Sequence, residues 1–594
     1  MKGVSHDTFA ILRHSLFLGE GTMGRKKIRQ ILLRSIFYLA VFFIFIMPLL
    51  GLLRMSVTLE SGGYGLDSYI RLLHEGRTLK AIKNTLLVSI GSTVISMLLG
   101  GFFAFLIAYT DIRRKKIMEL LVLAPFVIPS YIITLSWSNF LVKKGMVNTL
   151  LGAVGIPAID IYTLPGIIFV MGICNTPIVY LITVNMLRKV PRDLEWASRA
   201  SGYGLWHTML KINLAQVMPA LAGGGMLAFL SSIDNFAIPA FLGISSGIPV
   251  LSTYIYEKAI SFGPDSFHLA AALSVILSVI AIAGNVVQTK FIKKGANLES
   301  IKEDYSVRIK MKGRTRRFTE WGCLIFLTAI NIVPIISMMA SSFLKTYGAK
   351  FKIENLSLEN FEFVFTNRGV MQSIRNSITF ALTACAVCIL AGTAIAYMKV
   401  RKKSKAVTML EAGASLTYAV PGIVLSLSMI FHWTMLPNIY GTVKILIIAY
   451  ITRYLILQIK GSVTAMLSVD PTLEEAAMAS GSGRFRTWRK VLLPLLTRQV
   501  LSGAFVIFVS AMTEVTLSSM LAAAGTRTIG LTIFNLQQSG DYNLSSAMSS
   551  VIVAIVLMGY ALSFVFRRRK AGGIRAKGRE SSLNFKEEAV YYNG

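Results

Sequence analysis

Three ionisable residues interrupt long apolar stretches of this chain: Asp234 in FLSSIDNFAIPAFLG, Arg453 in IIAYITRYLILQ and Glu514 in FVSAMTEVTLSSMLAAAG. Charges in such stretches are costly, which makes them candidate functional groups. Asp234 and Glu514 fall at equivalent places in the chain, and two acids facing one axis would suit a cation or a basic gate. A pairing of Arg453 with Glu514 is one interpretation. The alternative is that each charge pairs locally or reaches a polar interface.

Two prolines stand at matching positions in the apolar segments, Pro129 in VIPSYI and Pro421 in AVPGIV. Proline lacks the N–H that a helix interior needs, and it therefore bends or breaks a helix. The bends either line a pathway or serve packing, and both interpretations stay open. Together with Asn235, which follows Asp234, these residues complete the set of pathway candidates.

A second group of polar residues forms two related loops, RDLEWASRASGYGLWHTMLKINL from Arg192 and DPTLEEAAMASGSGRFRTWRKVLLPLL from Asp470. Each pattern predicts a short helix with an acidic first turn, a glycine turn and a second helix. Small alanines permit close approach, and glycine permits a turn with positive φ. Docking a helix into a protein groove requires both features. The alternative is an amphipathic loop that lies on lipid headgroups, but that alternative does not explain why the loop occurs twice at equivalent places. The candidate docking residues are Glu195, Ala197, Gly202, Glu474, Glu475, Ala476, Ala477 and Gly481.

The elements that carry these residues are apolar runs of about 20 residues, the length that crosses a bilayer as a helix. The chain has 594 residues and is 54% hydrophobic. Backbone groups in lipid must be paired within their own segment, so we expect an all-α polytopic membrane protein. The twelve predicted spans are 31–54, 84–110, 117–139, 165–187, 216–243, 269–289, 319–343, 376–398, 406–432, 442–459, 497–523 and 544–566.

The spans fall into two six-helix repeats. Lys83-Asn84 recurs as Arg375-Asn376, Glu119 as Glu411, and the polar loops correspond to each other. Six is even, so the repeats run in parallel, and a path between them is expected. The predicted division is a tail at 1–30, a first half at 31–292, a linker at 293–318, a second half at 319–568 and a tail at 569–594.

The net charge of +32 fits this topology. With both termini in the cytoplasm, the basic clusters fall on the cytoplasmic side, as the positive-inside rule requires. This placement favours contact with the lipid bilayer over nucleic acid. No cleavable signal peptide is expected, because the first apolar run is too long for one.

The second loop resembles the EAA loop of ABC-importer permeases, the inner-membrane components of binding-protein-dependent transport systems. The matching residues are Glu475-Ala476-Ala477, Gly481 and Leu492-Leu493-Pro494. In that family the loop docks into a cytoplasmic ATPase. The first loop departs from the motif, because Trp196, Ser198 and Ala215 replace Glu475, Ala477 and Pro494. We therefore expect the second loop to be the stronger ATPase contact.

The resemblance is greatest to the fused, two-half ferric-iron branch, whose relatives include thiamine and phosphonate permeases. It implies two ATPase subunits and an extracytoplasmic substrate-binding protein as partners, in a bacterial inner membrane. No GxxxxGK[ST] phosphate loop occurs, so the energy must come from a partner chain or from an ion gradient. The chain itself is not expected to be an enzyme.

We expect neither a cofactor nor a metal site, because Cys174, Cys323, Cys385 and Cys388 lie within spans and the histidines are scattered. The favoured function is import of a small solute, ferric iron first. Thiamine, phosphonate or polyamine import and gradient-driven secondary transport remain alternatives, and a membrane scaffold or polymerase is the third class considered.

Overall fold

The computed structural model describes residue 32 and residues 35–560, except 60–61, 143–144, 262, 264, 296–302 and 350. This part of the chain is helical, with only isolated β-bridges and no strands. It contains nine helices long and apolar enough to cross a membrane, or up to eleven if each of two bent pairs counts as one span. The predicted all-α polytopic fold is confirmed. The predicted tails and residues 296–302 of the predicted linker lie outside the described residues.

The first half contains the elements up to the linker. In chain order they are η1 (Phe42–Ile46), α3 (Met47–Val57), α4 (Asp67–His74), α5 (Gly76–Tyr109), α6 (Lys115–Val127), α7 (Ser130–Phe140), α8 (Met146–Ala153), α9 (Leu164–Leu187), α10 (Arg192–Ala200), α11 (Leu205–Thr208), η2 (Met209–Asn213), α12 (Leu214–Asp234), α13 (Ala237–Gly243), α14 (Leu251–Ile260) and α15 (Ser266–Gly295).

The second half repeats this order with a shorter loop after its third span. Its elements are α16 (Gly313–Asn331), α17 (Val333–Ser341), η4 (Ile353–Asn355), α18 (Glu359–Thr366), α19 (Arg368–Val400), α20 (Lys405–Ala419), α21 (Gly422–Trp433), α22 (Val443–Leu467), α23 (Thr472–Ala479), α24 (Arg484–Thr487), η5 (Trp488–Leu492), α25 (Leu493–Met512), α26 (Thr516–Leu521) and α27 (Ile529–Ser539), followed by a helix over Tyr542–Tyr560.

The third span of each half is a sharply bent pair. The angle between α6 and α7 is 104°, and that between α20 and α21 is 115°. Pro129 and Pro421 are the N-cap residues of α7 and α21. Residues before a proline favour extended backbone, which ends the preceding helix there. The predicted bends are therefore present and amount to turns rather than mild kinks.

Two predicted spans at equivalent places in the halves each divide into a long helix and a short one. The span predicted at 216–243 is α12 followed by the short helix α13, and that at 497–523 is α25 followed by α26. The span predicted at 442–459 is α22, which extends to Leu467 and is not among the helices that pass as membrane spans. It carries Lys444, Arg453 and Lys460, yet it packs between α19 and α25 as α9 packs between α5 and α12.

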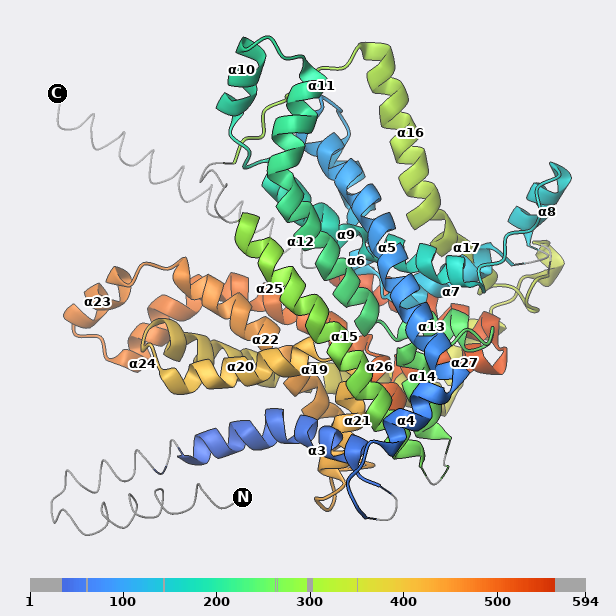
Figure 1. Cartoon of the computed structure of the whole chain (residues 1–594), viewed down its shortest axis with the longest axis vertical. Helices are drawn as coiled ribbons and strands as arrows, with labels where there is room; N and C mark the ends of the chain where they lie inside the picture. The colour runs from blue at the N-terminus through green and yellow to red at the C-terminus, as the bar shows by residue number, and fades with distance from the viewer. Residues whose placement is uncertain are drawn as a thin grey trace.

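The first span of each half packs on the opposite half. Helix α3 contacts α21, and α16 and α17 contact α6 and α7. In Figure 1 the dark blue α3 lies along the second-half helices, while α16 stands beside the first-half helices. The sequence repeats are therefore interlocked in space, and the helical part of the second repeat begins at Gly313, within the predicted linker.

The long helices form two arms that run in different directions (Figure 1). The first-half arm ends at α10 and α11, and the second-half arm ends at α23 and α24. The arms converge at the other end, near α13, α26 and α27. The two polar loops therefore lie far from the region where the halves meet.

Candidate functional site

A cavity of about 230 Å³ lies between the two halves, beside the breaks in the bent and divided spans. Its walls come from both repeats and carry many hydroxyl groups. The lining residues are Pro129, Ser130, Tyr131, Ala237, Tyr418, Arg453, Tyr454, Ser510, Thr513, Glu514, Val515 and Thr516. Three predicted pathway residues, Pro129, Arg453 and Glu514, thus line one cavity.

Asp234 contacts this lining through Arg453 and joins the two halves. Its Oδ2 accepts a hydrogen bond from Arg453 Nη2 at 2.7 Å, and its Oδ1 accepts one from the Gly422 backbone N–H, also at 2.7 Å. The Arg453 side chain is 9% exposed and that of Asp234 is 39% exposed. The suggested pairing of Arg453 with Glu514 is therefore wrong, since the ion-pair partner is Asp234 of the opposite half.

Glu514 has partners within its own half instead. It accepts hydrogen bonds from the Tyr454 hydroxyl and from the Leu517 backbone N–H, the latter at 3.0 Å. Asn235 accepts from the Ile238 N–H at 3.0 Å in the same i to i+3 pattern. Both side chains thus hold the first turn of a short helix, α26 and α13 respectively. The structural counterpart of Glu514 is therefore Asn235 rather than Asp234.

Two buried polar atoms on the cavity wall have no hydrogen-bond partner within the described part of the chain: Arg453 Nη1 and the Tyr131 hydroxyl. Buried polar groups are normally paired, so such atoms mark a place where a polar guest or water is accommodated. Asn235 donates to the Ser130 hydroxyl at 3.4 Å, and Pro421 precedes the glycine that contacts Asp234. Tyr131, Tyr418 and Tyr454 were missed from the sequence, because nothing local shows that three distant tyrosines meet.

An aromatic cluster packs the halves together near the cavity. Phe534 of α27 lies against Phe236, Phe241 and Tyr256 of the first half, with ring centroids 5.4 to 6.1 Å apart. These are favourable edge and tilted contacts between rings. Gln538 adds a hydrogen bond to the Ala240 carbonyl at 3.2 Å. This end of the molecule is therefore closed by side chains from both repeats.

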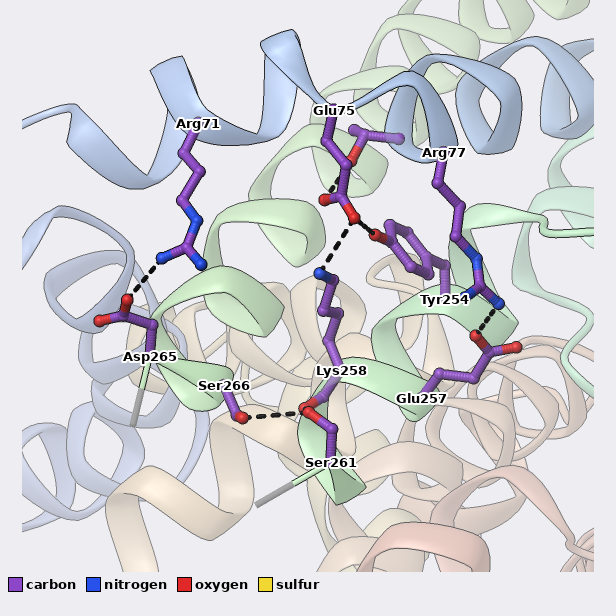
Figure 2. A network of polar contacts seen from close by, with 10 residues as sticks. Arg71, Glu75, Arg77, Tyr254, Glu257, Lys258, Ser261, Asp265 and Ser266 are labelled. Atoms are coloured by element: carbon purple, nitrogen blue, oxygen red, sulfur yellow. Dashed lines mark hydrogen bonds and ion pairs between the residues drawn. The ribbon is translucent and has the colours of Figure 1, made fainter. Parts of the chain in front are cut away.

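A charged network braces the first half at the same end (Figure 2). Arg71 pairs with Asp265 at 2.6 Å and Arg77 with Glu257 at 2.5 Å, while Glu75 accepts from Tyr254 at 2.6 Å and Lys258 at 3.3 Å. Burial alone would raise the pKa of Glu75, but the bonds from Tyr254 and Lys258 bring that pKa below its ordinary value. The network fixes α14 and α15 against α4 and α5.

The two polar loops have the predicted form, a helix followed by a glycine turn and a second helix. Gly202 and Gly481 have φ of +85° and +80°. An added Cβ would meet nothing within 4 Å at either position, so only the left-handed backbone requires glycine there. The loops are far apart, one at the end of each arm (Figure 1).

Each loop is held to its arm by one buried acid. Glu195 is 5% exposed and Glu474 is 8% exposed, and each pairs with an arginine. Glu475, Ala476 and Ala197 are exposed, while Ala477 is half-buried. Large apolar side chains also face outward from the loops: Leu194, Trp196, Tyr203, Trp206, Leu473, Met478 and Phe485.

Exposed apolar groups clustered on a short helix indicate a surface that binds a partner. Among the described residues, no group of three or more His, Cys, Asp or Glu side chains is placed to hold a metal ion. The described residues thus offer two candidate functional features, an outward-facing loop on each arm and a polar cavity between the halves.

Comparison with known proteins gives one family and several relatives. The family model of the binding-protein-dependent transport system inner membrane component matches residues 96–294 and again 388–572. A ferric transport system permease protein of Actinobacillus pleuropneumoniae is 25% identical over 532 residues, covering 89% of this chain and 76% of that protein. A putative ferric transport system permease protein of Haemophilus influenzae is 26% identical, over 82% of this chain and 77% of that protein. A putative 2-aminoethylphosphonate transport system permease protein of Salmonella typhimurium is 24% identical over 246 residues, or 41% of this chain and 84% of that protein.

Proposed function

Because this chain belongs to the family of binding-protein-dependent transport system inner membrane components, the permeases of ABC importers, we propose that it carries ferric iron into a bacterial cytoplasm. The chain is a transporter subunit rather than an enzyme. In the proposal, a binding protein delivers the solute on the outer side. ATP hydrolysis takes place on separate subunits, one at each loop. Both termini and the linker lie in the cytoplasm.

The observation that carries this proposal is the pair of exposed loops. Each loop presents apolar and small residues outward, while one buried glutamate fixes its other side to an arm. A helix held in this way transmits a push along the arm rather than bending under it. Because the arms diverge toward the loops, a motor that draws the loops together would change the angle between the halves.

The cavity supports a pathway closed on its outer side. The Asp234–Arg453 pair and the aromatic cluster around Phe534 both join the halves there. When the arms swing together at the loops, these contacts would separate and admit the solute from outside. Return to the present arrangement would close them again, which is alternating access.

The charge of the site favours a cation. Asp234 and Glu514 outnumber Arg453, and the cavity wall adds the hydroxyls of Tyr131, Tyr418 and Tyr454. Carboxylate and other oxygen ligands suit hard cations. The relatives named for ferric transport cover most of this chain, whereas the 2-aminoethylphosphonate relative covers 41% of it. Phosphonate import is therefore the second candidate.

The proposal is tested by comparing solute uptake in cells that have the chain with uptake in cells that lack it. We expect uptake of labelled ferric iron to require the chain. Uptake should also stop when the chain carries Gly481→Asp, or when the gene of an ATPase encoded beside it is deleted. Uptake of labelled 2-aminoethylphosphonate in place of iron would move the substrate to the second candidate. Uptake that survives loss of the ATPase but stops with a protonophore would contradict the importer and indicate a gradient-driven transporter.

A further inference from the structure

The described end of the linker runs along the cytoplasmic ends of the first-half helices. We call residues 303–312 the strap. The Asp304 N–H donates to the Arg188 carbonyl at 2.7 Å, and the N–H groups of Arg308 and Ile309 donate to the Tyr109 carbonyl at 2.9 Å. Arg192, in α10, donates to the Ser306 hydroxyl at 2.6 Å. The strap is therefore fastened to α5, to the end of α9 and to the first loop.

Arg308 is the buried centre of the strap. Its side chain is 1% exposed and forms an ion pair with Glu195 of the first loop. Its Nη2 donates to the Val190 carbonyl at 2.7 Å, its Nη1 donates to the Tyr109 hydroxyl at 3.1 Å, and its guanidinium lies 4.4 Å from the centre of the Tyr109 ring. The guanidinium thus ties the first loop to the end of α5.

The second half makes the same contacts from a different place in the chain. Arg401 donates from Nε to Glu474 at 2.6 Å and from Nη2 to the Val469 carbonyl at 2.9 Å. Val190 and Val469 each precede the buried glutamate by the same number of residues. The partner atoms are therefore equivalent in the two halves, although Arg401 directly follows α19 and Arg308 belongs to the linker.

The position equivalent to Arg401 in the first half is Tyr109. Both residues stand 33 positions after the first residue of their helix, α5 or α19. A tyrosine there cannot neutralise Glu195, and a buried carboxylate without a cation is costly. We propose that Arg308 supplies, from the linker, the guanidinium that the second half carries at Arg401. Arg308 is thus a positioning residue, and the first ATPase-docking loop depends on the linker for its placement.

The test uses spin labels at the ends of the two loop helices in the full-length chain. Each label is attached to a single cysteine, Ala200→Cys or Ala479→Cys, after replacement of the four native cysteines. Arg308→Gln should mobilise the label at 200 and leave the label at 479 unchanged, and Arg401→Gln should do the reverse. Arg314→Gln, which removes an exposed positive charge six residues after Arg308, should change neither label.

The decisive variant combines Tyr109→Arg with Arg308→Ala, which moves the guanidinium to the position used in the second half. We expect Arg308→Gln to reduce uptake about tenfold. The double variant should make the label at 200 immobile again and recover most of that uptake. An immobile label at 200 in Arg308→Gln would overturn the proposal. So would a double variant that keeps its label at 479 ordered but its label at 200 mobile. The labels report loop placement whatever solute is transported.

Discussion

The Asp234–Arg453 pair places a charge of each half against the other where the halves meet. A guanidinium that is 9% exposed has lost most of its water, and removing its partner leaves it uncompensated. Asp234 is 39% exposed, however, so solvent weakens the attraction. We infer that the pair serves mainly to hold the closed state together and to fix which atoms meet when it reforms.

We expect Asp234→Asn to destabilise the protein by about 1–3 kcal/mol, because Arg453 then stays buried without a carboxylate. Arg453→Gln should cost a similar amount. Thermal unfolding in detergent measures both changes. In a double-mutant cycle the combined variant should cost clearly less than the sum of the two single variants. Costs that simply add would show that the two side chains do not interact.

The glycine turns give a prediction with an internal control. Gly202→Ala and Gly481→Ala should each disfavour the left-handed turn by about 1–2 kcal/mol. The population of the loop conformation seen here would then fall roughly tenfold relative to other conformations. Gly204→Ala and Gly483→Ala should be tolerated, because those glycines have negative φ of −71° and −64°. Stimulation of the ATPase by the purified permease is the measurement. Equal effects at all four positions would contradict the assigned role of the turns.

The loops also differ in sequence, and this difference predicts unequal effects. Trp196 takes the place of Glu475, so the first loop lacks the acid at the outward position. We expect Gly481→Asp to reduce ATPase stimulation more than Gly202→Asp. A greater loss from Gly202→Asp would show that the first loop is the stronger contact.

At the scale of elements, the charged network between α4–α5 and α14–α15 gives a dependence on pH. The pKa of Glu75 is lowered in the folded protein, so its stabilisation is present above the ordinary glutamate value of about 4.3 and is lost as the pH falls below it. Glu75→Gln should therefore lower the Tm by about 1–2 °C at pH 7. The difference from the unchanged protein should hold down to about pH 4.3 and shrink as the pH falls further. A difference that grows on acidification would reverse the assigned sign.

Most spans could be predicted from apolar runs, because a bilayer imposes length and composition on each helix locally. The glycine turns and the proline bends were also predictable, since backbone chemistry at one residue decides them. The divisions after Asp234 and Met512 were not, because the apolar runs continue across them. The partners of Arg453 and Glu195 come from the opposite half and from the linker, and no local pattern encodes such contacts.

At the scale of the whole molecule, the interlocked first spans and the contacts where the halves converge constrain the motion in the proposed transport cycle. The arms must separate near α13 and α27 if the cavity is to open outward, while α3 and α16 stay on the opposite halves. We expect an engineered covalent cross-link across this closure to stop transport.

Cysteines at Ala240 and Gln538 provide that cross-link through a bifunctional methanethiosulfonate reagent, because the two residues lie across the halves within reach of one glutamine side chain. The reagent should abolish uptake, and a reductant that cleaves its disulfides should restore it. The control pair, Arg71→Cys and Asp265→Cys, lies within the first half and should leave uptake largely intact when cross-linked. Full uptake through a cross-linked Ala240–Gln538 pair would exclude opening at this place.

The strap has a consequence for how such a chain can be divided between genes. Arg308 neutralises Glu195 from the linker. If the gene were split so that neither product kept residues 303–312, the first product would hold Glu195 buried without a cation. Free single-half permeases descended from such an event would need an arginine at the position of Tyr109, as the second repeat has at Arg401. A basic residue there would indicate that the half once belonged to a fused chain and replaced the arginine that the linker had supplied.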